Sequence, residues 1–505
     1  MKNMAEQDKK EFEAFLKENL KPGETLFSEQ SNTLDRSFVP EPVYEEDPDL
    51  TGLYYAAWES AWGHIFTCPG APVQTYMNEG IRINKIWIWD TCFMVLFCRY
   101  AAKYFPGIQS LDNFYRVIHD GEYMILKVHH ADNPPLFAWT EHEYFKHTGD
   151  MERLKYILCD KQYLQKHYHW LEEVKAGSKF AYSSSTVAAQ WVPGRGFLWA
   201  GCPSGMDNTP RGDDDYTSIY WLDLSAQQGL SALYISRLFR IIGDEAQAEE
   251  WYKKFEEQKD FVNTRFWSDD DKIYFDRKVD ESGFCKVLTP ASFWPMLAEM
   301  CDNEQASQMA GVFEDPGKLG GERPIPSLSR DDHRFTPSGG YWRGSMWMPT
   351  AYMSIKALEK YGFYSLADSL ARKILRQQLK TWQNVEPHTI WECYSPTKDY
   401  PAENKVQCLV RQDFCGWSAL GPISLFIENI LGIRDVDVIS NSIVWEPASA
   451  KRSGIKNLRL GNNVVSLIAY PAQGKAEVEA SAAFTLRLNG SDIQCPPGKS
   501  VIPLP

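Results

Sequence analysis

Apolar residues along most of this chain recur at the spacing of α-helices. Between residues 222 and 238 they fall on every face, which predicts a helix that packs on two sides. Between residues 245 and 262 they keep to one face, and the opposite face carries glutamates. Gly243 and Asp244 stand between the two stretches as an end signal and a cap. We therefore expect an inner helix followed directly by an outer one.

The same alternation recurs elsewhere along the chain. Residues 90–105 and 416–431 are mostly apolar, and a further pair of helices is expected at 344–360 and 365–379. Gly149-Asp150 repeats the end signal between two helices. Inner and outer helices that alternate over about 350 residues predict a mainly α fold, a closed toroid of helical hairpins.

The pattern changes after about residue 435. Short stretches alternate apolar and polar positions, as in residues 484–489, and turn signals stand at 461–463 and 489–490. We expect a small antiparallel β unit packed on the helices. With an amphipathic helix at 8–20 and an extended polar arm to residue 50, the predicted divisions are 1–50, 51–435 and 436–505.

Two long polar segments, 177–215 and 313–343, interrupt the helical pattern and are rich in Gly, Pro and aromatic residues. Loops of that length inside a compact domain are usually functional. Aromatic residues make up 14% of the chain, and 18 of them are Trp. We expect about half of the Trp in polar segments to line a pocket and half to pack in the core: Trp191, Trp199, Trp342, Trp347, Trp391 and Trp417.

The charge and the cysteines exclude several classes of function. A net charge of −14 with no basic stripe argues against a nucleic-acid partner. The 11 Cys are scattered and form no C-x-x-C, so we expect neither a disulfide framework nor a metal or other cofactor. The sequence contains no apolar run of about 18 residues, so we expect no membrane span. Without a visible signal peptide we expect a cytoplasmic location, with a periplasmic or secreted one as the alternative.

We expect the His residues and the acidic triplets to have structural roles and not to bind metal ions. His64, His129 and His130 lack the spacing of zinc ligands, so we expect core or surface positions for them. The acidic triplets 213–215 and 269–271 lack the spacing of a calcium loop, and solvated turns are the expected structure.

Two acidic residues in aromatic loops are the candidates for catalysis. Asp207 lies in SGMDNTPR, where Gly205 and Pro210 indicate a turn, and an N-cap or Asx-turn is the structural alternative. Glu392 lies in WECYSP, with Glu386 and Glu403 as rivals nearby. A glycosidic bond is cleaved by one carboxyl group that donates a proton and another that stands opposite. We expect Asp207 and Glu392 to face each other across a cleft.

Other residues are candidates for sugar binding. Asp90 follows Trp87-Ile88-Trp89 and either caps the next helix or binds sugar hydroxyls beside a stacking Trp89. Arg211 offers a forked donor to hydroxyls or to a carboxylate. Arg343, in Tyr341-Trp342-Arg343-Gly344, either stacks between aromatic rings or forms the floor of a subsite.

These motifs resemble glycoside hydrolase family 63, which includes processing α-glucosidase I and bacterial mannosylglycerate hydrolase-like enzymes. The similar segments are SGMDNTPR, YWRGSMWM, WIWDTCF, NPPLFAW and WECYSPTKDYP, and they occur in family order over about residues 55 to 430. Asn133, where the family often has Gln, and Cys393, where it has a polar residue, depart from the pattern.

The resemblance implies an (α/α)6 barrel and an inverting mechanism, with Asp207 as general acid and Glu392 as general base. It implies that Trp89 and Asp90 hold the sugar at the cleaved end. It places further residues in the same neighbourhood: Arg211, Tyr341, Trp342, Gly344, Trp347 and Tyr394.

The sequence therefore predicts an inverting exo-glycosidase, an α-glycosidase that acts on a small oligosaccharide or glycoside. The alternatives are a trehalase-like or rhamnosidase-like toroid hydrolase, an unsaturated-glucuronyl hydrolase, and a non-catalytic carbohydrate-binding toroid.

Overall fold

The computed structural model describes residues 33–80, 84–213 and 215–504, together with residues 10, 13, 14, 17, 28 and 29. The helix expected at 8–20 and the first part of the expected arm fall mostly outside the described residues.

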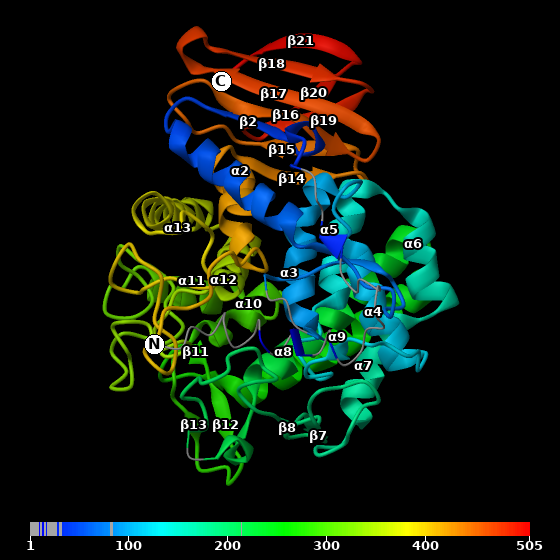
Figure 1. Cartoon of the computed structure of the whole chain (residues 1–505), viewed down its shortest axis with the longest axis vertical. Helices are drawn as coiled ribbons and strands as arrows, with labels where there is room; N and C mark the ends of the chain where they lie inside the picture. Colours follow the sequence, from blue (N-terminus) through cyan, green and yellow to red (C-terminus); the bar gives the residue numbers. More distant parts are fainter. Residues whose placement is uncertain are drawn as a thin grey trace.

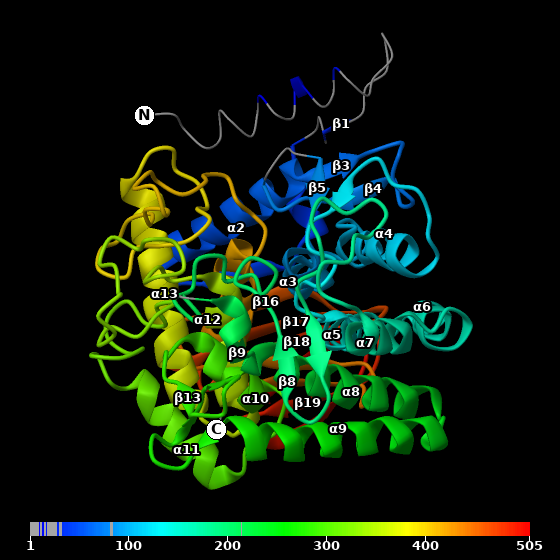
Figure 2. The same cartoon turned by 90° about the horizontal axis from the view of Figure 1, so that it is seen from below.

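Helices form the larger part of the molecule, and Figures 1 and 2 show them from two sides. The α-helices are α2 (Pro48–Gly63), α3 (Ile88–Cys98), α4 (Gly107–His119), α5 (Phe137–Thr148), α6 (Met151–Lys155), α7 (Tyr163–Glu173), α8 (Leu222–Ile242), α9 (Glu245–Phe266), α10 (Trp294–Leu297), α11 (Asn303–Ala310), α12 (Met348–Lys360) and α13 (Tyr364–Asn384). The last helical stretch differs from the expected α-helix, because a 3₁₀ turn η7 (Ser418–Leu420) precedes a π-helix η8 (Gly421–Ile430).

The helices pack in chain order as inner and outer members. α3 contacts α4 and α5, α5 contacts α8, α8 contacts α9 and α10, and α10 contacts α12, which contacts α13. The stretch η7–η8 touches both α12 and α3, and α2 lies over η8. α8 is buried on nearly every side, as its apolar pattern predicts, whereas α9 buries one face and exposes its glutamates.

Two Gly-Asp pairs end one helix and begin the next, as expected. Gly149 and Gly243 adopt left-handed backbone angles, with φ of 67° and 83°. Asp150 then accepts a hydrogen bond from the Arg153 N–H, and Asp244 accepts one from the Gln247 N–H. The two pairs thus join inner helices to their outer neighbours within a single residue or two.

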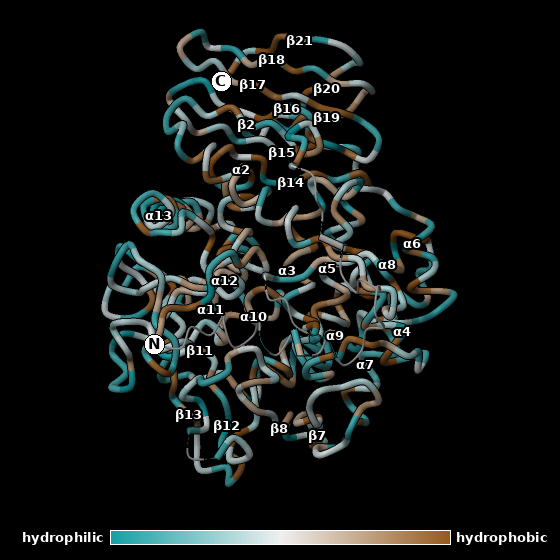
Figure 3. The backbone as a smooth tube through the Cα atoms, viewed as in Figure 1, coloured by the Kyte–Doolittle hydropathy of each residue, from teal (hydrophilic) through white to brown (hydrophobic). Residues whose placement is uncertain are grey.

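A two-sheet β unit covers one end of the helices, at the top of Figure 1. Its sheets have the orders β14-β15-β19-β20 and β2-β16-β17-β18-β21. Buried and exposed positions alternate along several strands, and Figure 3 shows the hydropathy along the same backbone. The strands are β2 (Glu41–Tyr44), β14 (Ile433–Asp437), β15 (Ser442–Trp445), β16 (Ser453–Leu460), β17 (Asn463–Tyr470), β18 (Lys475–Ala480), β19 (Phe484–Leu488), β20 (Ser491–Cys495) and β21 (Gly498–Pro503).

The β unit differs from the expected one in three respects. β15 and β19 run parallel, so the unit is not wholly antiparallel. The strand β2 comes from the arm before residue 50 and pairs with β16, so this arm is part of the β unit. The predicted boundary at 435/436 falls inside β14. The two-residue turns at 461–462 and 489–490 lie where the sequence places them.

The loops between helices carry only short strands. These are β1 (Ser28–Glu29), β3 (Ile65–Thr67), β4 (Thr75–Met77), β5 (Lys85–Ile86), β6 (Lys127–Val128), β7 (Gln190–Val192), β8 (Gly196–Leu198), β9 (Ile219–Tyr220), β10 (Trp267–Ser268), β11 (Ile273–Tyr274), β12 (Asp276–Lys278) and β13 (Phe284–Cys285). The long segment 314–347 has no helix or strand. Figure 1 shows β7, β8, β12 and β13 at the end of the molecule that lies away from the β unit, and parts of other loops, including Lys85, Gly205 and Tyr341, line the cavity described next.

Candidate active site

A cavity of about 290 Å³ opens at the N-terminal ends of α3 and α12. Asp207 and Glu392, which are 185 positions apart, both line it. Of the predicted binding residues, five line it as well: Trp89, Asp90, Tyr341, Trp342 and Trp347. The folding of distant loops over one helix end therefore brings most of the predicted site together.

The loop that carries Asp207 is held in place by its neighbours. Gly205 has a φ of 82° and leaves no space for a side chain, because an added Cβ would lie 2.3 Å from the Trp89 ring. Asn208 accepts a hydrogen bond from the Trp342 N–H (2.8 Å) and donates one to the Gly340 carbonyl (3.0 Å). The turn around Asp207 is thereby fixed to both Trp89 and the 340s loop.

Asp207 itself is half-buried and faces the cavity. Burial raises the pKa of its carboxyl to about 7; Lys405 opposes this shift, and the negative charge of Glu392 adds to it. A carboxyl group with such a pKa is protonated in a useful fraction near neutral pH, which is the state that a proton donor needs.

Glu392 has different surroundings. Its Oε1 accepts hydrogen bonds from the Tyr341 hydroxyl (2.9 Å) and from Arg411 Nη1 (3.0 Å), and its Oε2 accepts one from the Arg411 backbone N–H (3.1 Å). Tyr341 makes its bond from a left-handed backbone with a φ of 67°, a conformation that is uncommon outside glycine and that recurs at functional sites. Hydrogen bonds from a charged guanidinium are stronger than neutral ones, so these three donors hold the Glu392 carboxyl group in a fixed orientation.

A second pair of acidic residues lies at the base of the cavity. Asp90 is the third residue of α3, not its cap, so the N-cap alternative is wrong. Its carboxyl is hydrogen-bonded to Glu79, and burial raises the pKa of both groups. Within the described part of the chain, the other oxygen of Asp90 has no hydrogen-bond partner. This oxygen is available to accept a hydrogen bond from a bound hydroxyl group.

Tryptophan rings form the wall of the cavity. Trp342 and Trp347 stack with centroids 4.1 Å apart and planes at 6°, and Trp417 lies 5.7 Å from Trp89 and 5.6 Å from Trp347. The Trp417 indole N–H donates to the Glu392 carbonyl at 2.9 Å. Of the six Trp considered from the sequence, Trp342, Trp347 and Trp417 line the cavity, while Trp191, Trp199 and Trp391 do not.

Asn133 connects the two motifs that flank the cavity. Its Oδ1 accepts a hydrogen bond from the Trp89 N–H at 3.0 Å, and its Nδ2 donates one to the Pro203 carbonyl at 2.9 Å. Asn133, which stands where the family often has Gln, therefore orients Trp89 relative to the Asp207 loop.

Four of the predicted binding residues do not line the cavity. Arg211 is 1% exposed, and it pairs with Asp223 (2.8 Å) and Asp276 (2.6 Å) over the Trp221 ring. Its forked donors are occupied by carboxylates, so it fixes the end of the Asp207 loop instead of binding a sugar.

The other three have structural contacts as well. Arg343 pairs with Asp213 and donates to the Asn208 carbonyl, so it neither stacks nor forms a floor. Gly344 donates its N–H to Ser327 Oγ. The Tyr394 hydroxyl accepts the Trp391 N–H, which supports the loop that carries Glu392.

Several residues of the cavity were missed or misplaced from the sequence. Lys85, His129 and His130 line it, so the expected core or surface positions are wrong for these two histidines. Lys405 and Arg411 also line it, from a polar loop that has no aromatic signature. Glu79, the partner of Asp90, precedes the Trp87–Asp90 motif and was not distinguished from a surface glutamate. The rivals Glu386 and Glu403 lie outside the cavity.

The described residues contain neither a cluster of metal ligands nor a membrane-spanning helix. None of their His, Cys, Asp and Glu side chains gather in threes or more in a way that would hold a metal ion. Within the same part of the chain, no helix combines the length and apolar content that a bilayer span requires.

Cleavage of a glycosidic bond is a reaction that two carboxyl groups perform when they face one cavity lined by aromatic rings. Comparison with known proteins agrees and assigns the chain to this class of hydrolase. Residues 126–414, more than half of the chain, match the mannosylglycerate hydrolase MGH1-like glycoside hydrolase domain, and the chain belongs to that family. The resemblance to glycoside hydrolase family 63 is thereby confirmed.

Two relatives show how far the likeness extends. An uncharacterized protein of Borreliella burgdorferi is 25% identical over 420 residues, which are 79% of this chain and 83% of that protein. Mannosyl-oligosaccharide glucosidase of Saccharomyces cerevisiae is 25% identical over 306 residues, which cover 53% of this chain and 34% of the yeast enzyme. The chain thus spans about a third of the yeast glucosidase.

Two solved structures share the fold. The family 63 mannosylglycerate hydrolase of Thermus thermophilus, solved with Tris and D-glycerate, has a TM-score of 0.55 at 15% identity and covers 74% of this chain and 99% of its own. A sialidase has a TM-score of 0.67 at 12% identity and covers 99% of this chain and 43% of its own. Likeness at these identities establishes an α/α toroid type of fold.

Proposed function

We propose that this chain is an inverting, exo-acting glycoside hydrolase, an α-glycosidase that acts on a small oligosaccharide or glycoside. The observation that carries the proposal is the contrast between two carboxyl groups in one cavity. Among the described residues, Asp207 has no charged donor in hydrogen-bond contact and its pKa is raised to about 7, whereas Glu392 accepts three hydrogen bonds, two of them from Arg411.

In the proposed reaction Asp207 is the general acid and Glu392 the general base. Asp207 donates its proton to the glycosidic oxygen as the bond to the anomeric carbon breaks. Glu392 accepts a proton from a water molecule as that water attacks the anomeric carbon from the opposite face. Both protons are accounted for, and the product has the inverted configuration. Inverting enzymes hold the two carboxyl groups roughly 6.5–9.5 Å apart to admit this water.

The size and lining of the cavity support a small substrate cleaved at its end. A volume of about 290 Å³ lies at the lower limit of ordinary small-molecule sites, about 300 Å³. Trp89, Trp342 and Trp417 offer flat faces to the apolar side of a sugar ring. Asp90, with its unpartnered oxygen, offers an acceptor to a sugar hydroxyl group.

The leaving group is the part of the substrate that the structure distinguishes best. Lys85 and Lys405 line the cavity, and neither forms an ion pair within the described residues. These two lysines, of which Lys405 acts on Asp207, favour a leaving group with a negative charge, and the Thermus relative was solved with D-glycerate. A neutral disaccharide such as trehalose remains the alternative substrate.

The helix contacts support a closed (α/α)6 barrel as the scaffold of this site. α3, α5, α8, α10 and α12 each contact the next, and the η7–η8 stretch contacts both α12 and α3. Each of the helices α3, α5, α8, α10 and α12 is followed along the chain by an outer helix. An experimental structure in which η8 lies apart from α3 would contradict closure.

A substrate panel tests the proposed function. Mannosylglycerate, trehalose, aryl α-glucosides, aryl α-mannosides and aryl α-rhamnosides are compared by kcat/KM with the wild-type protein. We expect measurable turnover with an α-glycoside and the highest kcat/KM with an anionic leaving group. Sugar binding without turnover of any glycoside would instead favour the non-catalytic binding toroid. The cytoplasmic location stays a prediction that cell fractionation tests.

A further inference from the structure

A second cavity, of about 300 Å³, lies at the other end of the same inner helices. Asp90, near the start of α3, lines the first cavity, and Arg99, just after its end, lines the second. Nine residues of helix at 1.5 Å per residue separate the two by about 14 Å. The strands β14 and β15 complete the second cavity with Arg434, Asp435 and Val444. It therefore lies between the helices and the β unit and shares no lining residue with the candidate active site.

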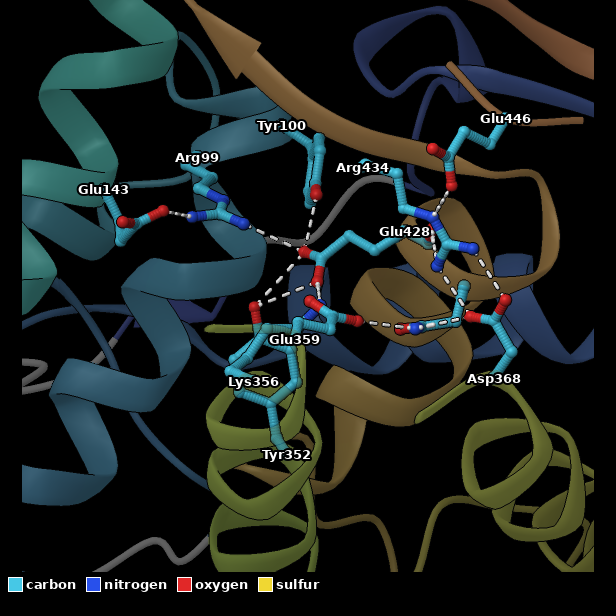
Figure 4. Close-up of polar contacts among 11 residues, drawn as sticks. Arg99, Tyr100, Glu143, Tyr352, Lys356, Glu359, Asp368, Glu428, Arg434 and Glu446 are labelled. Carbon is cyan, nitrogen blue, oxygen red and sulfur yellow. Dashed lines mark hydrogen bonds and ion pairs between the residues drawn. The ribbon is translucent and has the colours of Figure 1, made fainter. Parts of the chain in front are cut away.

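The charged groups around this cavity pair with one another (Figure 4). Arg99 donates to Glu143 at 2.7 Å and to Glu428 at 2.9 Å. Lys356 contacts Glu428 at 2.6 Å and Glu359 at 2.7 Å. These contacts join the turn that follows α3 to the helices α5, α12 and η8.

The pairing continues toward the β unit. Lys146 contacts Asp435 at 2.5 Å, and Arg434 contacts Asp368 at 2.6 Å. Lys360 contacts Glu299 at 3.0 Å. Every cation that lines the cavity thus has a carboxylate partner, and every lining carboxylate has a cation. A charged ligand would have to displace one of these partners, whereas a neutral ligand would not.

Two neutral polar side chains of the cavity differ, because the described residues satisfy their hydrogen-bonding groups poorly or not at all. His147, on α5, is 5% exposed. The Glu143 carbonyl lies near its ring, but neither ring nitrogen has a hydrogen-bond partner of good distance and angle among the described residues. Tyr234, on α8, is fully buried, and its hydroxyl has no partner among those residues. Both side chains line the cavity. Buried polar groups are almost always hydrogen-bonded, so a molecule in the cavity is the expected partner.

The charge state of His147 decides the kind of molecule. Burial and the adjacent Arg99 hold the pKa of its imidazole well below the ordinary value, so the ring is neutral. A neutral ring has one donor and one acceptor, and a tyrosine hydroxyl can serve as either. Hydroxyl groups of a ligand match this set in both directions. Trp139 and Tyr352 add aromatic surface to the walls.

We propose that the second cavity is a binding site for a small neutral polyhydroxylated molecule, between glycerol and a monosaccharide in size, held by His147 and Tyr234. The cavity is as large as the candidate active site, which accounts for the size limit. No residue of the proposed reaction takes part, so the site exists or fails independently of the glycosidase assignment.

D-Glucose and glycerol are the probes for the test. Crystals of the full chain are grown without either compound and soaked in each, and the affinity of D-glucose is measured by calorimetry in solution. We expect electron density for the probe in the second cavity, with hydroxyl groups at hydrogen-bond distance from His147 and Tyr234, and two binding events in solution if glucose also enters the active site. Ordered water alone in the second cavity would overturn the proposal.

Two conservative variants identify the groups that bind. Tyr234→Phe removes one hydroxyl, and His147→Phe removes both ring nitrogens with little change in size. Each should weaken glucose binding at the second cavity about tenfold, the effect of one lost hydrogen bond of good geometry, while kcat/KM on the best substrate stays within about twofold. Tyr123→Phe, at an exposed tyrosine away from both cavities, is the matched control. Unchanged glucose binding in Tyr234→Phe, which deletes a single atom and should fold, would overturn the assignment even if His147→Phe did not fold.

Discussion

The two ends of the inner helices contain buried carboxylates in opposite situations. At the end with the loops, one cavity is lined by four acidic residues: Glu79, Asp90, Asp207 and Glu392. Among the described residues, the ion pair of this group is the one between Glu392 and Arg411. At the end with the β unit, each acidic residue of the second cavity faces a cation, and Figure 4 draws the pairs of Glu143, Glu359 and Glu428. The same helices therefore support an unbalanced cluster at one end and a balanced one at the other.

The pKa values follow from this difference. Burial raises the pKa of Asp90 and of Asp207, because few cations offset the loss of water. Burial acts on Glu428 too, but Lys356 and Arg99 hold its pKa below the ordinary value. Balanced charges fix a structure, whereas unbalanced ones keep a proton available for transfer. The comparison predicts that substitutions will affect turnover at one end and stability at the other.

The largest effect is expected from the two proposed catalytic residues. Asp207→Asn and Glu392→Gln should each lower kcat by about 10²–10⁴-fold, because each removes one proton transfer while keeping the shape of the side chain. Steady-state kinetics on the best glycoside measures this. Asp270→Asn and Glu386→Gln, at positions outside the cavity, are the matched controls.

The leaving group separates the two roles. An aryl glycoside with an acidic phenol needs little protonation, so Asp207→Asn should retain more activity on it than on an alkyl glycoside, and Glu392→Gln should not. Equal losses on both substrates for Asp207→Asn would contradict its role as the acid.

At the balanced end the expected effect is on stability. Glu428→Gln should lower the free energy of unfolding by about 3–5 kcal/mol, because Arg99 and Lys356 lose a charged partner in a buried position. Urea denaturation of the variant and of Glu386→Gln, a substitution at an exposed glutamate, measures the difference. A loss as small as that of the control would show that the network contributes little.

At the unbalanced end, removal of a carboxyl group should raise the free energy of unfolding instead of lowering it. The pKa of Asp90 is raised in the folded state above its unfolded value of about 3.9, so ionisation favours unfolding once the pH exceeds about 4. Below that pH both states are protonated and the effect is absent. Asp90→Asn cannot ionise, and its gain in stability over the wild type should therefore grow as the pH rises from about 4 toward 8.

Thermal unfolding at pH 4.5 and at pH 7.5 measures this gain, with KM expected to rise in the same variant because Asp90 loses its acceptor oxygen. A variant that is less stable than the wild type at pH 7.5 would show that Asp90 is balanced by a charge after all.

The smallest expected effect concerns the pH profile. Activity should fall as the pH rises through about 7, because the general acid Asp207 loses its proton there. Lys405 lowers this pKa, so Lys405→Met should move the alkaline limb upward by up to about one pH unit. Lys398→Met, at an exposed lysine outside the cavity, should leave the limb in place. A downward shift for Lys405→Met would contradict the proposed charge effect.

Local patterns were sufficient for most of the helices. The Gly-Asp pairs at 149–150 and 243–244 predicted caps because left-handed glycine and an Asp acceptor act within a few residues. The place of β2 in a sheet could not be predicted, because its partner β16 is about 400 positions away and nothing local specifies that pairing. The π-helical form of η8 was also missed, since its apolar pattern is that of an ordinary buried helix.

The site was predictable where aromatic residues flank the acidic ones. Asp207 and Glu392 stood out for that reason and from the family motifs, whereas Glu79 and Arg411 lie in segments without such a signature. Arg211 was misplaced because its guanidinium suits a sugar and a carboxylate equally well, and only the fold shows that Asp223 and Asp276 occupy it. Charge balance is likewise a property of the folded chain, since it depends on partners distant in sequence.

The stereochemistry of the first product tests the central claim most directly. Proton NMR of the sugar released from an α-glycoside, recorded before mutarotation, reports the configuration at the anomeric carbon. Attack of a water activated by Glu392 predicts that the β-anomer is released first. Initial release of the α-anomer would mean that configuration is retained and would contradict the proposed roles of Asp207 and Glu392.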